Sequence, residues 1–265
     1  MSPVRVISAL QRASGRHMMV RKAGQMATAG IRKRTQTIRS GPAKGLKINV
    51  AGSRLGYILG TTEGETQQIM RETLASGDVF YDLGANIGFL SLVAAALVGR
   101  DGAVYSFEPL PANVAVLRAN AKRNGLDQIE VVEAAISDES GTATLAIGRS
   151  DQDGKLDKNV VTADELNISV TVTTIDAYIA AGARPPTLIK IDVEGVELAA
   201  LRGMSHTLRM HHPQLICELH AHAPSIDSHP VAIELRRHGY SIRWLESEIS
   251  GAVGFWACHL VTVVD

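Results

Sequence analysis

The sequence predicts an α/β protein built on a doubly wound, mostly parallel sheet with helices on both faces. Two observations lead to this prediction. Short β-rich runs alternate with helical segments from residue 79 onward, and a strand, helix, strand order implies parallel pairing through right-handed crossovers. The last two β-rich runs are separated only by a short glycine-containing stretch, which cannot hold a crossover helix. We therefore expect the final strand pair to be antiparallel.

The elements of the first half follow in order. The apolar run "VFYDL" predicts a strand over residues 79–83, and an amphipathic helix is expected over 87–98. A second strand is expected over 103–107. The next helix should begin at Pro111 and end just before Gly125, because proline is tolerated in the first helical turn and glycine just past the last one. The run "QIEVVEAAI" then predicts a third strand.

The second half contains further strands and two further helices. Polar and apolar residues alternate in "GTATLAIG" and "NISVTVTTI", as in half-buried strands, and the polar loop "RSDQDGKLDKN" lies between them. Buried strands are predicted for "TLIKIDVEG" and "PQLICELHAH", and the helical segments "VELAALRGM" and "HPVAIELRRHG" follow them. The runs "YSIRWLE" and "VGFWACHLVTVVD" form the final pair.

Composition is consistent with one folded domain. With 265 residues, of which 45% are hydrophobic, the chain can bury one sizeable core. Cys217 and Cys258 both lie in apolar stretches, which disfavours a disulfide framework. The longest apolar run, residues 90–98, is too short to cross a bilayer, and the N-terminus lacks the apolar core of a secretory signal. We expect a soluble, cytoplasmic protein without a transmembrane segment; a homo-oligomer stays an open alternative.

The N-terminal residues 1–62 are strongly basic, and we expect them to form an extension ahead of a folded domain at 63–265. They hold twelve of the 27 Lys and Arg residues and none of the 27 Asp and Glu residues, so they carry +12 against −12 in the remainder. Such an arm can bind nucleic acid, an anionic membrane or an acidic substrate, can mimic a transit peptide, or can dock on its own acidic domain. Tyr57 is its only aromatic residue, which disfavours nucleic acid because bases stack on aromatic side chains.

The turn after the first predicted strand is the candidate binding site. In a doubly wound sheet, ligands bind at the carboxyl ends of the strands, where the strand order reverses. Glycines at 84 and 88 would let a ligand approach the backbone, and the carboxylate of Asp82 would meet a cationic amine. Glu108, at the end of the second strand, could accept both hydroxyls of a ribose. The spacing D-x-G-x-N-x-G differs from the G-x-G-x-x-G of dinucleotide sites, so we predict another nucleoside-bearing cofactor.

Five blocks in order carry a family resemblance: "FYDLGANIGFLSL", "VYSFEPLPANVAVLRANAKRNGL", "VEAAISDESGTATL", "TLIKIDVEGVELAALRGM" and "LICELH". Together they resemble the FkbM-type S-adenosylmethionine-dependent methyltransferases over residues 63–264, and the basic arm lies outside the resemblance. The resemblance implies a Rossmann-like, seven-stranded methyltransferase sheet with an antiparallel last strand. It also implies S-adenosyl-L-methionine as methyl donor and O-methylation of a hydroxyl on a sugar, glycan or natural product. It does not identify the acceptor.

The resemblance carries cofactor-site roles onto particular residues. The family's cofactor turn is matched by Asp82, Gly84, Asn86 and Gly88, and its ribose acid by Glu108. The adenine-side segment is matched by Ala135 with Ser137 and Asp138. The "KIDVEG" block is matched by Asp192 and Glu194. Asp138 has an alternative role as the cap of the turn "SDESG".

Asp192 is the predicted general base, because it follows the fourth parallel strand, beside the first. It alternatively binds the methionine end of the cofactor or caps the next helix. Glu218 and His220 alternate on the fifth strand and would project on the same side, near Asp192. They could form an acid/base pair or, as a less favoured alternative, a divalent metal site. Glu197 is expected on the solvated face of its helix.

Three classes of function follow. The leading class is a methyltransferase acting on a small-molecule or glycan hydroxyl. The second is a methyltransferase acting on nucleic acid or protein through the basic arm; no N-P-P-Y or D-P-P-Y sequence, typical of enzymes that methylate base amino groups, follows the fourth strand. The third is a nonenzymatic cofactor-binding module or a nicotinamide oxidoreductase. Binding of S-adenosylmethionine separates the oxidoreductase from the methyltransferases.

Overall fold

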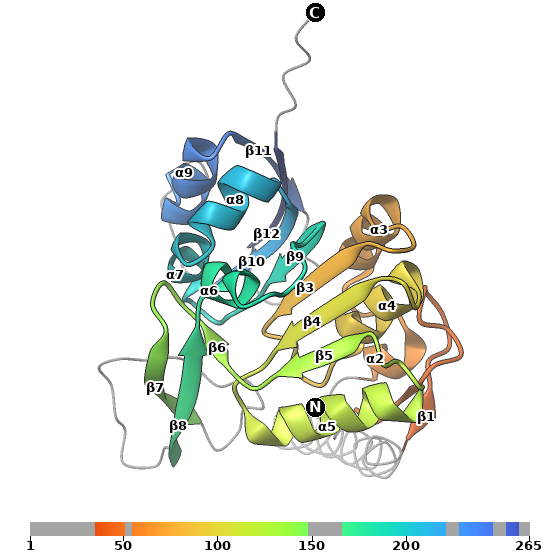
Figure 1. The fold of residues 1–265 in the computed structure, drawn as a ribbon. Coiled ribbons are helices and arrows are strands. Elements are labelled where there is room, and N and C mark those ends of the chain that lie inside the picture. Colours follow the sequence, from red (N-terminus) through yellow and green to blue (C-terminus); the bar gives the residue numbers. More distant parts are fainter. Residues whose placement is uncertain (1–34, 51–54, 148–165, 221–227, 246–252, 260–265) are drawn as a thin grey trace, which may run out of the picture.

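A seven-stranded sheet forms the centre of the protein (Figure 1). The computed structural model describes residues 35–50, 55–147, 166–220, 228–245 and 253–259. The strands are β1 (Gln36–Thr37), β2 (Lys47–Ile48), β3 (Val79–Leu83), β4 (Ala103–Phe107), β5 (Ile129–Val132), β6 (Ala135–Ile136), β7 (Gly141–Ile147), β8 (Leu166–Thr173), β9 (Leu188–Ile191), β10 (Gln214–Leu219), β11 (Tyr240–Leu245) and β12 (Val253–His259). The helices are α2 (Gly56–Leu59), α3 (Gly64–Thr73), α4 (Phe89–Val98), α5 (Pro111–Arg123), α6 (Ile175–Ala180), α7 (Glu197–Arg202), α8 (Ser205–His211) and α9 (Pro230–Arg237).

The strand order of the large sheet is β11-β12-β10-β9-β3-β4-β5. Strands β5, β4, β3, β9 and β10 are parallel, whereas β12 is antiparallel to both of its neighbours. The predicted doubly wound sheet with an antiparallel last strand is therefore confirmed. The chain runs from β3 outward through β4 to β5 and then returns to β9 on the other side of β3, so the strand order reverses between β3 and β9.

Strand β3 is buried along its whole length, and its side chains alternate between two hydrophobic cores. Phe80 packs in the core that includes α3 and α4, whereas Tyr81 and Leu83 pack in the core that includes α7, α8 and α9. These helices lie on opposite sides of the sheet (Figure 1). The predicted helices on both faces are therefore present, and Asp82, next to Tyr81 and Leu83, points to the α4 side.

The expected third strand is divided between two sheets. Strand β5 is the edge of the large sheet, whereas β6 pairs with β8 in a three-stranded sheet of order β6-β8-β7. A turn separates them, with Ala134 N donating to the Val132 carbonyl. The small sheet has its own apolar cluster, in which Leu145 and Leu110 are buried. The predicted polar loop between β7 and β8 falls outside the described residues.

The packed core begins before residue 63, which corrects the expected boundary of the extension. Ile38, Ile48 and Ile58 are all buried in the core that includes α4. The residue just after α5 also bonds to the backbone of β2: Asn124 both donates to the Lys47 carbonyl and accepts from the Lys47 N–H, each at 2.7 Å. These apolar residues were not recognised from the sequence, because they lie in a basic stretch and their spacing fits neither a helix nor a strand. Residues 1–34 lie outside the described part of the chain.

Of the helices in the described ranges, none is both long and apolar enough to cross a membrane.

We predict that Ile48→Ala destabilises the protein by about 2–5 kcal/mol, because the fully buried side chain is removed and leaves a cavity. Leu59→Ala is the matched control, since that side chain is 52% exposed and should change the free energy of unfolding by less than about 0.5 kcal/mol. Urea unfolding followed by circular dichroism measures both. If both substitutions changed the free energy of unfolding by equally small amounts, residues 35–62 would be a peripheral extension.

Candidate functional site

An open cavity lies at the carboxyl ends of β3, β4 and β9, where the strand order reverses. This is the position at which doubly wound sheets bind ligands. The cavity is lined by Gly84, Asn86, Phe107, Glu108, Pro109, Leu110, Asn113, Ala134, Ala135, Ile136, Leu145, Asp192, Val193 and Glu194. The structure thus brings together the predicted site residues Gly84, Asn86, Glu108, Ala135 and Asp192. Asp82 and Gly88 do not line it.

The two glycines of the turn after β3 are required by contacts within the protein. Gly84 has a φ of 80°, and a Cβ atom there would lie 1.8 Å from the Asp192 carbonyl oxygen. Gly88 has a φ of 85°, and its Cβ would lie 2.7 Å from Cγ of Leu117 on α5. The sequence predicted glycine here for close approach of a ligand. The structure adds a second reason, because the turn itself packs against α5 and the residue after β9, while Gly84 also lines the cavity.

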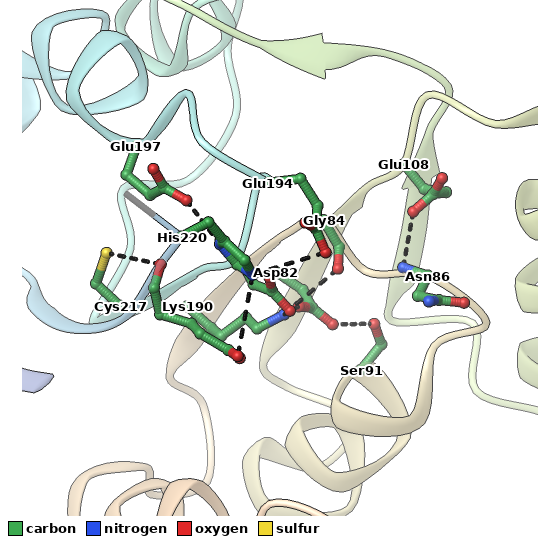
Figure 2. A network of polar contacts seen from close by, with 12 residues as sticks. Asp82, Gly84, Asn86, Ser91, Glu108, Lys190, Glu194, Glu197, Cys217 and His220 are labelled. Atoms are coloured by element: carbon green, nitrogen blue, oxygen red, sulfur yellow. Dashed lines mark hydrogen bonds and ion pairs between the residues drawn. The ribbon is translucent and has the colours of Figure 1, made fainter. Parts of the chain in front are cut away.

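Glu108 is buried at the end of β4 and faces the same turn (Figure 2). Its carboxylate accepts hydrogen bonds from Asn86 N at 2.8 Å, Leu110 N at 3.0 Å and the Asn113 side chain at 3.3 Å. Burial raises the pKa of Glu108, and these three donors oppose that rise. The donors fix the carboxylate on the cavity wall, where it can still accept hydrogen bonds from a ligand, since each oxygen has two lone pairs.

Asp82 lies behind the cavity wall and is only 1% exposed. One carboxylate oxygen accepts from Ser91 Oγ at 2.6 Å, and Ser91 in turn accepts from Ser106 Oγ at 2.9 Å. The other oxygen lies 4.0 Å from Nζ of Lys190. Burial raises the pKa of Asp82, whereas Lys190 and Ser91 lower it. The cation beside Asp82 is therefore a lysine of the protein, whereas the sequence predicted a ligand amine.

Lys190 is a site residue that the sequence analysis missed. It is buried on β9 directly opposite Asp82 on β3, and its Nζ donates to Asp192 Oδ2 at 3.0 Å and to the Gly84 carbonyl at 3.4 Å. Burial by itself would lower the pKa of Lys190, but Asp192 and Asp82 more than offset this and raise the pKa above its usual value. The only available signal was a lysine inside an otherwise apolar strand, "TLIKID".

His220 lies just past the end of β10 among carboxylates from three elements (Figure 2). Its Nδ1 is 2.9 Å from Oε1 of Glu197. Its Nε2 lies 3.5 Å from Asp192, 3.6 Å from Glu194 and 4.0 Å from Glu218. The hydrogen bond to Glu197 raises the pKa of His220 to about 9; burial opposes this, and Asp192 and Glu194 add to it. His220 is therefore a cation at neutral pH, and the predicted proximity of Glu218, His220 and Asp192 is observed.

Glu197 was expected to be solvated, and this was wrong. The residue is 2% exposed and accepts from both the His220 ring and Gly195 N, each at 2.9 Å. It is the first residue of the short helix α7, whose first turn packs beside the end of β10. A six-residue helix gives too few turns for its periodicity to show which face is buried.

Glu63 is a second residue that the sequence analysis missed. It precedes α3 in the left-handed conformation, with a φ of 54°, which is strained for a residue other than glycine. Burial raises the pKa of Glu63 to about 7; Lys190 lowers it, and the carboxylates of Asp192, Asp82 and Glu218 raise it. A chain segment that precedes the large sheet thus places another acid beside the Lys190 and Asp192 pair.

The cluster at the ends of β9 and β10 also has the spacing that a divalent cation could bridge. Ligand atoms of Asp192, Glu194 and His220 all lie within 4.8 Å of one another. The metal site considered from the sequence, as a less favoured alternative, contained Glu218, whereas this group contains Glu194.

Comparison with known proteins gives a consistent set of matches. The "Methyltransferase FkbM domain" family model matches residues 82–242. The 31-O-demethyl-FK506 methyltransferase FkbM of Streptomyces tacrolimicus is 31% identical over 199 residues, which cover 64% of this chain and 75% of that protein. The hexuronic acid methyltransferase AglP of Haloferax volcanii is 28% identical over 162 residues, which cover 60% of this chain and 63% of that protein. The crystal structure of methyltransferase FkbM from Methylobacillus flagellatus aligns with a TM-score of 0.45 at 18% identity and covers 91% of this chain and 60% of that one.

We predict that Lys190→Met lowers the free energy of unfolding by about 3–5 kcal/mol, because it leaves the buried Asp82 carboxylate without its cation. Lys122→Met is the control, since Lys122 is exposed on α5. Urea unfolding at neutral pH compares the two. A loss no greater than that of the control would show that the buried pair contributes nothing to stability.

Proposed function

The chain belongs to the FkbM methyltransferase family and is an S-adenosylmethionine-dependent methyltransferase, and from this premise we propose that it O-methylates a hydroxyl group of a small molecule, a sugar or a glycan. The observation that carries the proposal is the position of Asp192, which lines the cavity beside the β3 turn and is contacted by two cationic side chains. The names of the two relatives support it, since they specify 31-O-demethyl-FK506 and a hexuronic acid as the substrates of those proteins.

We assign the cofactor to the side of the cavity formed by the β3 turn, β4 and β6. Glu108 would accept hydrogen bonds from the ribose hydroxyls, and Ala135, Ile136 and Leu145 provide an apolar wall for the adenine. The backbone of Gly84 and Asn86 borders the same space. Asp82 contributes from behind the wall, because it accepts from Ser91 of α4 and lies beside Lys190, which bonds the turn at Gly84.

Asp192 is the proposed general base. S-adenosylmethionine supplies an electrophilic methyl group on a sulfonium. When bound, S-adenosylmethionine would give this methyl group to the acceptor oxygen and leave as the neutral thioether, and Asp192 would accept the hydroxyl proton. Lys190 donates to one oxygen of this carboxylate and His220 faces the other, so the side chain is oriented before an acceptor arrives.

A nucleic-acid or protein acceptor is the alternative. Its support is the basic N-terminal stretch, most of whose Lys and Arg residues fall within residues 1–34, outside the described part of the chain. The acceptor test below includes both classes.

We predict that Glu108→Ala weakens binding of S-adenosylhomocysteine and S-adenosylmethionine about 10- to 150-fold, since charge-assisted hydrogen bonds contribute about 1.5–3 kcal/mol. Glu72→Ala is the control, because Glu72 is exposed on α3. Titration calorimetry measures both affinities. An unchanged affinity in Glu108→Ala would overturn the ribose assignment.

We predict that Asp192→Asn lowers turnover about 10²- to 10⁴-fold, while cofactor affinity stays within a few-fold, because the amide keeps the shape and loses the basicity. Transfer of isotope-labelled methyl from S-adenosylmethionine is measured with hydroxyl-bearing saccharides and macrocycles, RNA and protein as acceptors. Asp127→Asn is the control, since Asp127 is exposed between α5 and β5.

The same assay tests the proposed acceptor and the metal alternative. We expect label in an alkali-stable ether of a saccharide or macrocycle, with activity unchanged by EDTA. Label only in RNA or protein would favour the alternative acceptor class. Loss of activity with EDTA that a divalent ion restores would place a metal at Asp192, Glu194 and His220. Full activity of Asp192→Asn would leave catalysis to positioning of the acceptor alone.

A further inference from the structure

We propose that Glu197 is a positioning residue for methyl transfer: its buried carboxylate fixes the His220 ring so that Nε2 faces Asp192, which lines the cavity. The inference rests on the proposed function, because it adds a residue to the same site. Glu197 is not among the residues that line the cavity, so it would act only through His220.

The contact between Glu197 and His220 is short and buried. Oε1 of Glu197 lies 2.9 Å from Nδ1 of His220 and also accepts from Gly195 N at 2.9 Å, with Glu197 only 2% exposed. An ionised carboxylate can only accept hydrogen bonds, so Nδ1 of the ring must carry the proton. The same oxygen therefore joins the ring to the backbone turn that carries Glu194.

The other ring nitrogen faces the remaining charged groups. Asp192 and Glu194 come from the turn after β9, and Glu218 comes from β10; their nearest oxygens lie between 3.5 and 4.0 Å from Nε2. A flipped ring would offer a carbon to Glu197 and leave a buried carboxylate without this donor. Burial of a charged group without its partner is costly, so Glu197 selects one orientation of the ring.

This orientation gives Asp192 two fixed neighbours. Lys190 donates to Oδ2 at 3.0 Å, and His220 presents Nε2 to Oδ1 at 3.5 Å. Lys190 and His220 thus each face a different oxygen of the Asp192 carboxylate. Each of the two cations has a buried carboxylate on its far side, Asp82 for Lys190 and Glu197 for His220.

The test uses the full chain with Glu197→Gln, which removes the charge and keeps the shape, and Glu197→Asp, which keeps the charge. Glu234→Gln is the matched control, because Glu234 of α9 pairs at 3.6 Å with another histidine, His238, just past the end of that helix. Three quantities are measured in buffers with EDTA: the ¹⁵N chemical shifts of the His220 ring, the affinity for S-adenosylhomocysteine, and kcat and KM for methyl transfer.

We expect Nδ1 of His220 to be the ring nitrogen that keeps its proton in the wild-type protein and in Glu197→Asp, because it faces the Glu197 carboxylate. In Glu197→Gln this preference for Nδ1 should weaken, because a neutral amide oxygen is a weaker acceptor than a carboxylate. Turnover in Glu197→Gln should fall about 10- to 100-fold with an unchanged cofactor affinity, and Glu197→Asp should recover part of it. Glu234→Gln should match the wild type.

The inference is overturned if the ring shifts of Glu197→Gln equal those of the wild type, or if kcat is unchanged in a variant whose ring has changed. If Glu197→Gln does not fold, a wild-type His220 whose Nδ1 carries no proton overturns it alone. The ring shifts require no turnover, and cofactor affinity is measured separately. Failure of the proposed function would appear as absent cofactor binding or absent methyl transfer in the wild type, with the ring shifts unaffected.

Discussion

The buried ammonium group of Lys190 is the constraint on which the rest of the site depends. A cation removed from water costs several kcal/mol unless close carboxylates offset that cost. The register of β3 against β9 places Asp82 opposite Lys190, and Asp192 lies two residues farther along the same strand. The strands at the point where the sheet order reverses therefore cannot shift relative to each other without leaving a charge unpaired.

The same arrangement is repeated on the neighbouring strand with histidine in place of lysine. His220 follows β10 and has the buried Glu197 on its far side, as Lys190 has Asp82. Asp192 lies between the two cations and is the member of this group that lines the cavity. A carboxylate with fixed neighbours at both oxygens loses little entropy when an acceptor hydroxyl binds it, which is the advantage of preorganisation.

The sequence was sufficient for the parts of the site that depend on local pattern. Strand ends and turn residues placed Gly84, Asn86, Glu108 and Asp192 on one cavity wall, because parallel strands bring their carboxyl ends to one edge. The partners of these residues depend on strand register and on which face of a short helix is buried, and a local sequence pattern predicts neither. Lys190 acquires its role only through pairing with β3.

The turn after β3 and the end of β9 are also joined at one contact. Only glycine at position 84 allows the turn to approach the Asp192 carbonyl, and Lys190 bonds both the Gly84 carbonyl and the Asp192 carboxylate. The turn and the proposed base therefore share one hydrogen-bond donor. Groups that share partners in this way do not act independently, so the effects of substitutions in the turn and at the end of β9 are not additive. Lys190 thus positions both the turn after β3 and the carboxylate of Asp192.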